Sequence, residues 1–142
     1  HKPVYVPSNL YIIGTMNVAD RSLALVDMAF RRRFAFINLE PNLNKTWKDY
    51  VVNKLHMDSS VANYIQSEIV NLNSQIASDS RLGKDFQVGH SFFTPNESLK
   101  TKDSKKWFRE VVESEIEPLL QEYWFDSLEE ADKAIEKLLA NL

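Results

Sequence analysis

The residues best suited to chemistry follow an apolar run near the start of the chain. After residues 10–13 (LYII), a polar loop carries Asn17, Asp20 and Arg21. A carboxamide both donates and accepts hydrogen bonds, which suits Asn17 to orienting a water molecule or a phosphate oxygen. A structural alternative stays open, because Asp20 or Ser22 can cap a following helix by accepting a hydrogen bond from an unpaired amide.

Three consecutive arginines, Arg31, Arg32 and Arg33, follow a short segment of helical character. A structural explanation is that cations are favoured at a helix C-terminus, by roughly a few tenths of a kcal/mol each. The functional alternative is an arginine finger, a guanidinium that stabilises the negative charge developing in phosphoryl transfer. A contact with a DNA backbone would need more basic residues than the flanks supply.

A parallel sheet would position these residues. Residues 10–13 and 34–39 are apolar runs typical of buried parallel strands, and a short helix is predicted at residues 23–30 between them. This order predicts a right-handed βαβ unit with its polar loop beyond the carboxyl end of a strand, where ligands bind. Because one βαβ unit cannot complete a sheet, we expect a fragment whose earlier strands lie outside the sequence.

From residue 41 onward the pattern becomes helical. Asp58 can cap a long helix that carries a stripe of apolar residues at helical spacing: Val61, Ile65, Ile69, Leu72 and Ile76. Shorter helices are predicted around residues 47–55 and from Lys105, where Pro118 either kinks the helix or opens the next one. A capping box of Ser127 and Glu130 predicts the start of a terminal helix.

A loop between the predicted helices contains Gly89, His90 and Ser91. An isolated histidine usually makes a structural hydrogen bond, and no second histidine nearby supports a metal site. The chain therefore divides into residues 1–40, part of an α/β core, and residues 41–142, an all-α domain.

Composition narrows the class of protein. The 142 residues are 44% hydrophobic and 26% charged, as in globular proteins, and the net charge of -3 does not favour nucleic acid as the main partner. The absence of cysteine excludes disulfides and thiolate metal sites. No apolar run approaches the roughly 20 residues of a membrane span, and no signal-peptide pattern opens the chain, so we expect a cytoplasmic protein.

The sequence lacks the parts that usually grip a nucleotide. It contains no G-x-x-x-x-G-K-[S/T] phosphate loop and no acidic pair at the end of an apolar strand to hold Mg²⁺. Its three glycines, at positions 14, 83 and 89, could not build such a loop. We therefore expect the isolated chain to bind no nucleotide and to be inactive.

Three blocks of sequence resemble the McrB family of AAA+ proteins, the GTP-dependent motor subunits of modified-cytosine restriction systems. They are GTMNVADRS with the following LALVDMAFRRRF, then LGKDFQVGHSFF, and then EIEPLLQEY, in the family's order. The resemblance implies that residues 1–40 are the C-terminal part of a AAA+ core. Residues 41–142 would be its α-helical lid.

The resemblance also implies roles for the residues near the N-terminus. Residues 10–15 would be the strand that carries sensor 1, and Asn17 would be the polar residue near the γ-phosphate and the attacking water. Asp20 and Arg21 would complete the MNxxDR loop, which is implicated in hydrolysis and in its stimulation by the nuclease partner McrC. Arg32 and Arg33 match the arginines that act at the subunit interface.

In the lid, Gly89, His90 and Ser91 match the family's GHSYF block, with Phe92 in place of the tyrosine. Because AAA+ lids usually present a sensor 2 residue to the nucleotide, these three residues could approach its phosphates or base. The segment has no arginine of the usual sensor 2 kind.

The resemblance implies GTP, or ATP, with Mg²⁺ as the cofactors of the complete protein. The implied partners are identical subunits in a ring, an McrC-like nuclease, and DNA bound through regions outside this chain. Two alternatives remain: an ATP-dependent relative with another partner, and a non-catalytic interaction module.

Overall fold

The computed structural model of the protein describes residues 5–16, 32–99 and 103–142. The chain divides into two units, residues 1–36 and residues 37–142.

The predicted βαβ unit is not formed by the described residues. Residues 10–15 and 34–39 are irregular rather than strands, and the helix predicted at residues 23–30 lies outside the described part of the chain. Their apolar side chains face solvent, with Tyr11 89% and Ile13 95% exposed. A parallel strand needs neighbouring strands and cover on both faces, and the described residues supply neither. The strand predictions are therefore wrong for this structure.

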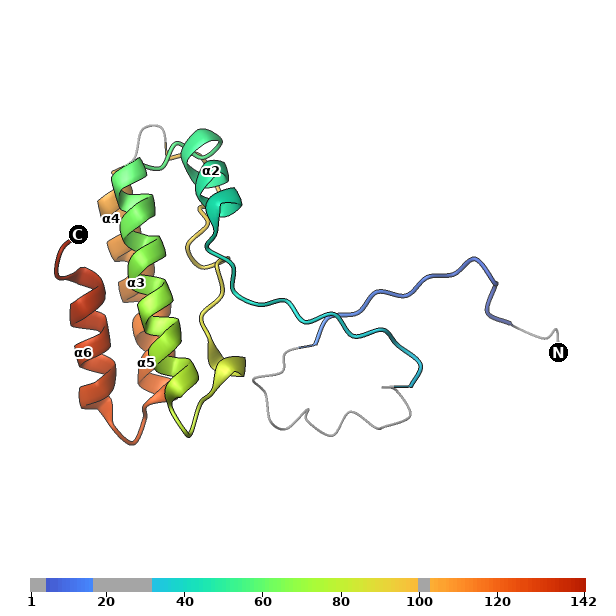
Figure 1. Cartoon of the computed structure of the whole chain (residues 1–142). Helices are drawn as coiled ribbons and strands as arrows, with labels where there is room; N and C mark the ends of the chain where they lie inside the picture. Colours follow the sequence, from blue (N-terminus) through green and yellow to red (C-terminus); the bar gives the residue numbers. More distant parts are fainter. Residues whose placement is uncertain (1–4, 17–31, 100–102) are drawn as a thin grey trace. The chain divides into compact units, whose positions relative to one another are not determined.

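The second unit is built from helices joined by turns and irregular segments, and each helix predicted for it is present. They are α2 (Lys45–Asn53), α3 (Ser59–Ser78), α4 (Ser104–Val111), α5 (Glu117–Tyr123) and α6 (Leu128–Leu139). A short 3₁₀ turn, Lys84–Phe86, lies in the long connection between α3 and α4. In Figure 1 the long α3 runs beside α6.

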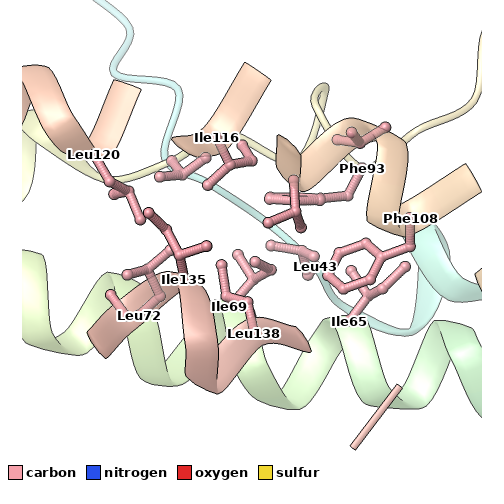
Figure 2. Close-up of a cluster of buried hydrophobic side chains, with 14 of the residues drawn as sticks. Leu43, Ile65, Ile69, Leu72, Phe93, Phe108, Ile116, Leu120, Ile135 and Leu138 are labelled. Atoms are coloured by element: carbon pink, nitrogen blue, oxygen red, sulfur yellow. The ribbon is translucent and has the colours of Figure 1, made fainter. Parts of the chain in front are cut away.

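The core of this unit is organised around α3. Asp58 caps the helix as predicted, because its side chain accepts hydrogen bonds from the backbone N–H groups of Ser60 and Val61. The predicted apolar stripe is buried, with no member more than 4% exposed. Figure 2 shows side chains from other elements around it: Leu43, Phe93, Phe108, Ile116, Leu120, Ile135 and Leu138. Burying each such side chain contributes about 1.5–3 kcal/mol.

One turn of π-helix, Val112–Ile116, joins α4 to α5. The N–H of Glu117 donates to the carbonyl of Val112, five residues earlier, and Pro118 lies in the first turn of α5. Proline has no N–H to donate, and in a regular α-helix its ring clashes with the carbonyl four residues earlier. The wider π turn therefore precedes Pro118, which opens the next helix.

A cluster of charged side chains joins the end of α3 to the start of α6. Arg81 forms ion pairs with Asp79 at 3.0 Å, Asp126 at 2.6 Å and Glu130 at 3.1 Å. The buried Trp124 donates its indole N–H to Asp79 at 2.9 Å. The hydrogen bonds from Arg81 and then from Trp124 hold the pKa of Asp79 well below its ordinary value of 3.8. The ionised carboxylate is therefore the form that stabilises this corner.

The capping box predicted at the start of α6 is not formed. Ser127 is the N-cap residue, but its side chain makes no capping hydrogen bond. Its N–H donates to the carbonyl of Trp124 at 2.8 Å, and the carboxylate of Glu130 binds Arg81. Both partners of the box are engaged elsewhere, so the sequence predicted the start of the helix but not its hydrogen bonds.

We expect Asp79→Asn to lower the free energy of unfolding at neutral pH and to make that free energy change less as the pH is lowered. Because the pKa of Asp79 is lowered on folding, its contribution is fully present above the ordinary value of 3.8 and is lost as the pH falls through the folded value. Asparagine accepts hydrogen bonds but carries no charge to pair with Arg81. Urea denaturation at neutral pH and below pH 3.8 measures both effects.

The control is Asp132→Asn, at an exposed position of α6. It should leave the acid dependence unchanged. The same loss of stability on acidification in Asp79→Asn as in the unmodified protein would show that Asp79 is not the group that titrates.

Candidate functional site

The predicted site residues near the N-terminus are only partly described. Asn17, Asp20 and Arg21 lie outside the described residues. Arg32 and Arg33 lie in a turn of the first unit and are exposed. Both guanidinium groups are therefore accessible to another molecule, as an interface role requires.

The loop of the second unit displays its three predicted site residues between two buried anchors. Val88 before them is 1% exposed, and Phe93 after them is 0% exposed. Between these anchors, Gly89 is half-buried, and His90 and Ser91 are exposed. The structure thus brings the three residues together at the surface on a short segment that is fixed at both ends.

Asn73 of α3 holds the first anchor. Its amide nitrogen donates to the carbonyl of Val88 at 2.9 Å, and its side-chain oxygen accepts from the N–H of Val88 at 2.7 Å. The side chain of Gln87 also donates to the backbone carbonyl of Asn73 at 3.2 Å. Sequence reasoning missed Asn73. Its position next to Leu72 of the apolar stripe was the available signal. A carboxamide there is buried with the stripe, and a buried carboxamide must find hydrogen-bond partners.

The second anchor is held by α2 and by the core. Trp47 donates its indole N–H to the hydroxyl of Thr94 at 3.1 Å, and that hydroxyl donates to the carbonyl of His90 at 2.8 Å. The N–H of Phe93 also donates to the carbonyl of His90, at 3.2 Å. The ring of Phe93 packs against Phe108 with 6.1 Å between ring centroids. The backbone at His90 is therefore tied to two helices.

The side chain of His90 makes one structural contact, and its other ring nitrogen has no partner among the described residues. Its Nδ1 accepts a hydrogen bond from the backbone N–H of Asn42 at 3.2 Å. A ring nitrogen that accepts carries no hydrogen, so the neutral ring bears its hydrogen on Nε2. The structural hydrogen bond expected of an isolated histidine is confirmed. It leaves an Nε2–H that can donate to an oxygen atom of a ligand.

Within residues 5–16, 32–99 and 103–142, no group of three or more histidine or acidic side chains could hold a metal ion. The same described ranges contain no helix both long and apolar enough to cross a membrane.

Two comparisons with known proteins bear on this arrangement. Residues 64–132, from within α3 to within α6, match the family described as "McrB, alpha-helical lid domain". The chain is also 42% identical over 139 residues to the Type IV methyl-directed restriction enzyme EcoKMcrB subunit of Escherichia coli (strain K12). Residues 64–132 therefore belong to the McrB lid family, and the chain is similar to an McrB subunit over nearly its whole length. The aligned region is 96% of this chain and 30% of that McrB subunit, so the chain spans less than a third of its relative's length.

The match to the McrB lid assigns the helical unit. It covers most of α3, the loop of residues 88–93 that carries His90 (the displayed loop), α4 and α5. The predicted helical lid is therefore confirmed, while the predicted boundary between residues 40 and 41 stays a prediction.

We expect Asn73→Ala to loosen the displayed loop. Removing the carboxamide leaves the N–H and carbonyl of Val88 without their partners, which costs about 1–3 kcal/mol for each buried group that water cannot reach. Urea denaturation should show the loss of stability. Hydrogen exchange should show faster exchange of the Val88 amide.

Asn71→Ala is the matched control, because Asn71 is an exposed asparagine two residues earlier in α3. It should change neither quantity appreciably. Equal Val88 exchange in the two variants would contradict the anchoring role of Asn73.

Proposed function

We propose that this chain is the C-terminal portion of a AAA+ nucleoside triphosphatase. The complete protein would be the GTP-hydrolysing, DNA-translocating motor subunit of a restriction system directed at 5-methylcytosine. The observation that carries the proposal is the 42% identity to a methyl-directed restriction enzyme subunit, which extends over 96% of this chain rather than over the lid alone. It therefore includes the polar loop and the arginine turn.

The exposed apolar runs near the N-terminus support the proposal. Ile13 and Ile37 are 95% and 82% exposed, and Tyr11 and Leu39 are 89% and 86% exposed. A sheet with helices on both faces would bury such side chains, at a gain of about 1.5–3 kcal/mol for each large one. We propose that residues 10–15 and 34–39 become neighbouring strands when the remaining strands of a AAA+ core are present.

In the proposed mechanism, two sets of residues act on the terminal phosphate from different subunits. The carboxamide of Asn17 orients the attacking water, and Asp20 and Arg21 complete the hydrolysis loop in the same subunit. Arg32 and Arg33 reach the nucleotide of a neighbouring subunit, where their charge stabilises the negative charge that develops during transfer. Their exposure in the turn is consistent with this role.

Residues outside this chain would supply the phosphate loop and the ligands of Mg²⁺. The metal ion of such reactions neutralises charge on the phosphate oxygens. The described residues include no group that could hold it. We therefore propose that the isolated chain neither binds nor hydrolyses nucleotide.

The displayed loop of the lid would approach the nucleotide of its own subunit. The Nε2–H of His90 can donate to a phosphate or ribose oxygen while Nδ1 remains bound to Asn42. Gly89 and Ser91 flank it on the same fixed segment. This donor would stand in the place where AAA+ lids usually present an arginine.

The proposed partners follow from this assignment. They are identical subunits arranged in a ring, an McrC-like nuclease, and DNA bound through regions outside this chain, in the cytoplasm. An ATP-dependent relative would differ in its base preference, and a non-catalytic interaction module would show no turnover. Assays of the full-length protein with GTP and with ATP separate these three cases.

We expect Arg32→Ala and Arg33→Ala in the full-length protein to reduce hydrolysis by about 10³-fold or more, as when an arginine finger is removed. The affinity of the monomer for nucleotide should change little, because the finger acts on a neighbour. Phosphate release measures turnover, and calorimetry measures affinity.

Arg109→Ala removes an exposed arginine of α4 and is the matched control. It should retain turnover. Normal turnover in both Arg32→Ala and Arg33→Ala would remove these arginines from the mechanism.

We expect Asn17→Ala to lower hydrolysis by about 10²-fold, because the attacking water loses the side chain that orients it. Asn9→Ala, at an exposed position before the apolar run, should have no effect. Single-turnover assays with bound nucleotide isolate the chemical step. If Asn17→Ala changes only the melting temperature, Asn17 is a structural residue.

A further inference from the structure

A hollow beside the displayed loop has a lining that the mechanism above does not use. It has a volume of about 250 Å³ and lies between residues 91–96 and one face of the helix that follows. Its apolar side chains include Phe92, Trp107 and Val111. Its polar ones include Ser91, Asn96 and Glu115. Pockets for drug-sized ligands hold about 300–1,000 Å³, so this hollow suits a planar ring system rather than a whole nucleotide.

The helical wall of the hollow comes from successive turns of one face. Trp107, Val111 and Glu115 are spaced four residues apart, which places them along the same side of the helix. Glu115 belongs to the π turn Val112–Ile116. π-Helical turns are rare in proteins, and those that occur are often found at functional sites.

Four of the polar groups that line the hollow are not used by the fold. Within the described residues, the hydroxyl of Ser91, the carboxamide of Asn96, the indole N–H of Trp107 and the carboxylate of Glu115 make no hydrogen bond or ion pair. By contrast, the hydroxyl of Thr94, which also lines the hollow, both accepts and donates a hydrogen bond. Donors and acceptors without internal partners thus converge around an aromatic surface, which is the usual make-up of a ligand site.

We propose that this hollow binds the guanine base of the nucleotide. Guanine has two adjacent donors, N1–H and the 2-amino group, and a carboxylate such as Glu115 can accept from both. Adenine has an acceptor at N1 and no donor at position 2, so it cannot make this pair of hydrogen bonds. The carboxamide of Asn96 can donate to the guanine O6, and the ring of Trp107 supplies a stacking surface.

This assignment rests on the proposed function, because it places the base of a nucleotide whose phosphates are held by other residues. Ser91 belongs both to the displayed loop and to the lining of the hollow. A base in the hollow therefore lies beside the loop that carries His90. Base preference would then be determined by the lid of this chain.

The test measures binding of GTP, ITP and ATP to the full-length protein by calorimetry. ITP carries inosine, which differs from guanosine only in lacking the 2-amino group. Glu115→Gln should weaken GTP binding by about tenfold or more and ITP binding by less, so that the preference for GTP over ITP shrinks. Trp107→Leu should weaken all three nucleotides by similar factors, because stacking does not distinguish the bases.

Glu113→Gln is the control, because it changes an exposed glutamate of the same π turn that does not line the hollow. It should bind all three nucleotides as the unmodified protein does. If Glu115→Gln leaves the ratio of GTP to ITP affinity unchanged, the base assignment is wrong. The proposed function would still stand in that case, provided that Arg32→Ala reduces hydrolysis. Absence of any nucleotide binding by the unmodified full-length protein would overturn both.

Discussion

Burial of the apolar face of α3 is the interaction on which the lid depends, and the other helices pack against this face and exclude water from it. Its five stripe residues are almost fully buried against side chains from the helices and from the long connection. Asn73 lies next to this face, so its carboxamide is fixed by the same packing. Because Asn73 is fixed in the core, its hydrogen bonds to Val88 hold the displayed loop in place. The position of His90 depends on burial of a helix to which it does not belong.

The two units of the chain differ in what they can bury. The helical unit closes its own core and also ties the end of α3 to α6 through Arg81. The apolar runs near the N-terminus stay exposed, because a parallel strand gains its stability only from neighbours on both sides. The sheet predicted for the first residues of the chain therefore needs further strands. This difference explains why a well-formed lid and an unformed sheet segment can occur in one chain.

Local patterns predicted the helices well. The stripe from Val61 to Ile76, the cap at Asp58 and the break at Pro118 each depend on residues within one or two turns. Tertiary contacts were not predicted. Asn73 binds Val88, which is fifteen residues away, and Glu130 forms an ion pair with Arg81 instead of the predicted capping hydrogen bond. The roles of the site residues came from the family resemblance. Composition and spacing alone left structural explanations open, such as a helix cap at Asp20, cations at a helix C-terminus for Arg32 and Arg33, and a structural hydrogen bond for His90.

Mixing two inactive full-length variants tests most directly whether one active site is shared between subunits. One carries Arg32→Ala with Arg33→Ala, and the other carries Asn17→Ala. If the arginines act on a neighbour's nucleotide, mixed rings contain sites with an intact Asn17 from one subunit and intact arginines from the next. We predict that mixing restores hydrolysis well above the sum of the two variants. Turnover no greater than that sum would contradict a site shared between subunits.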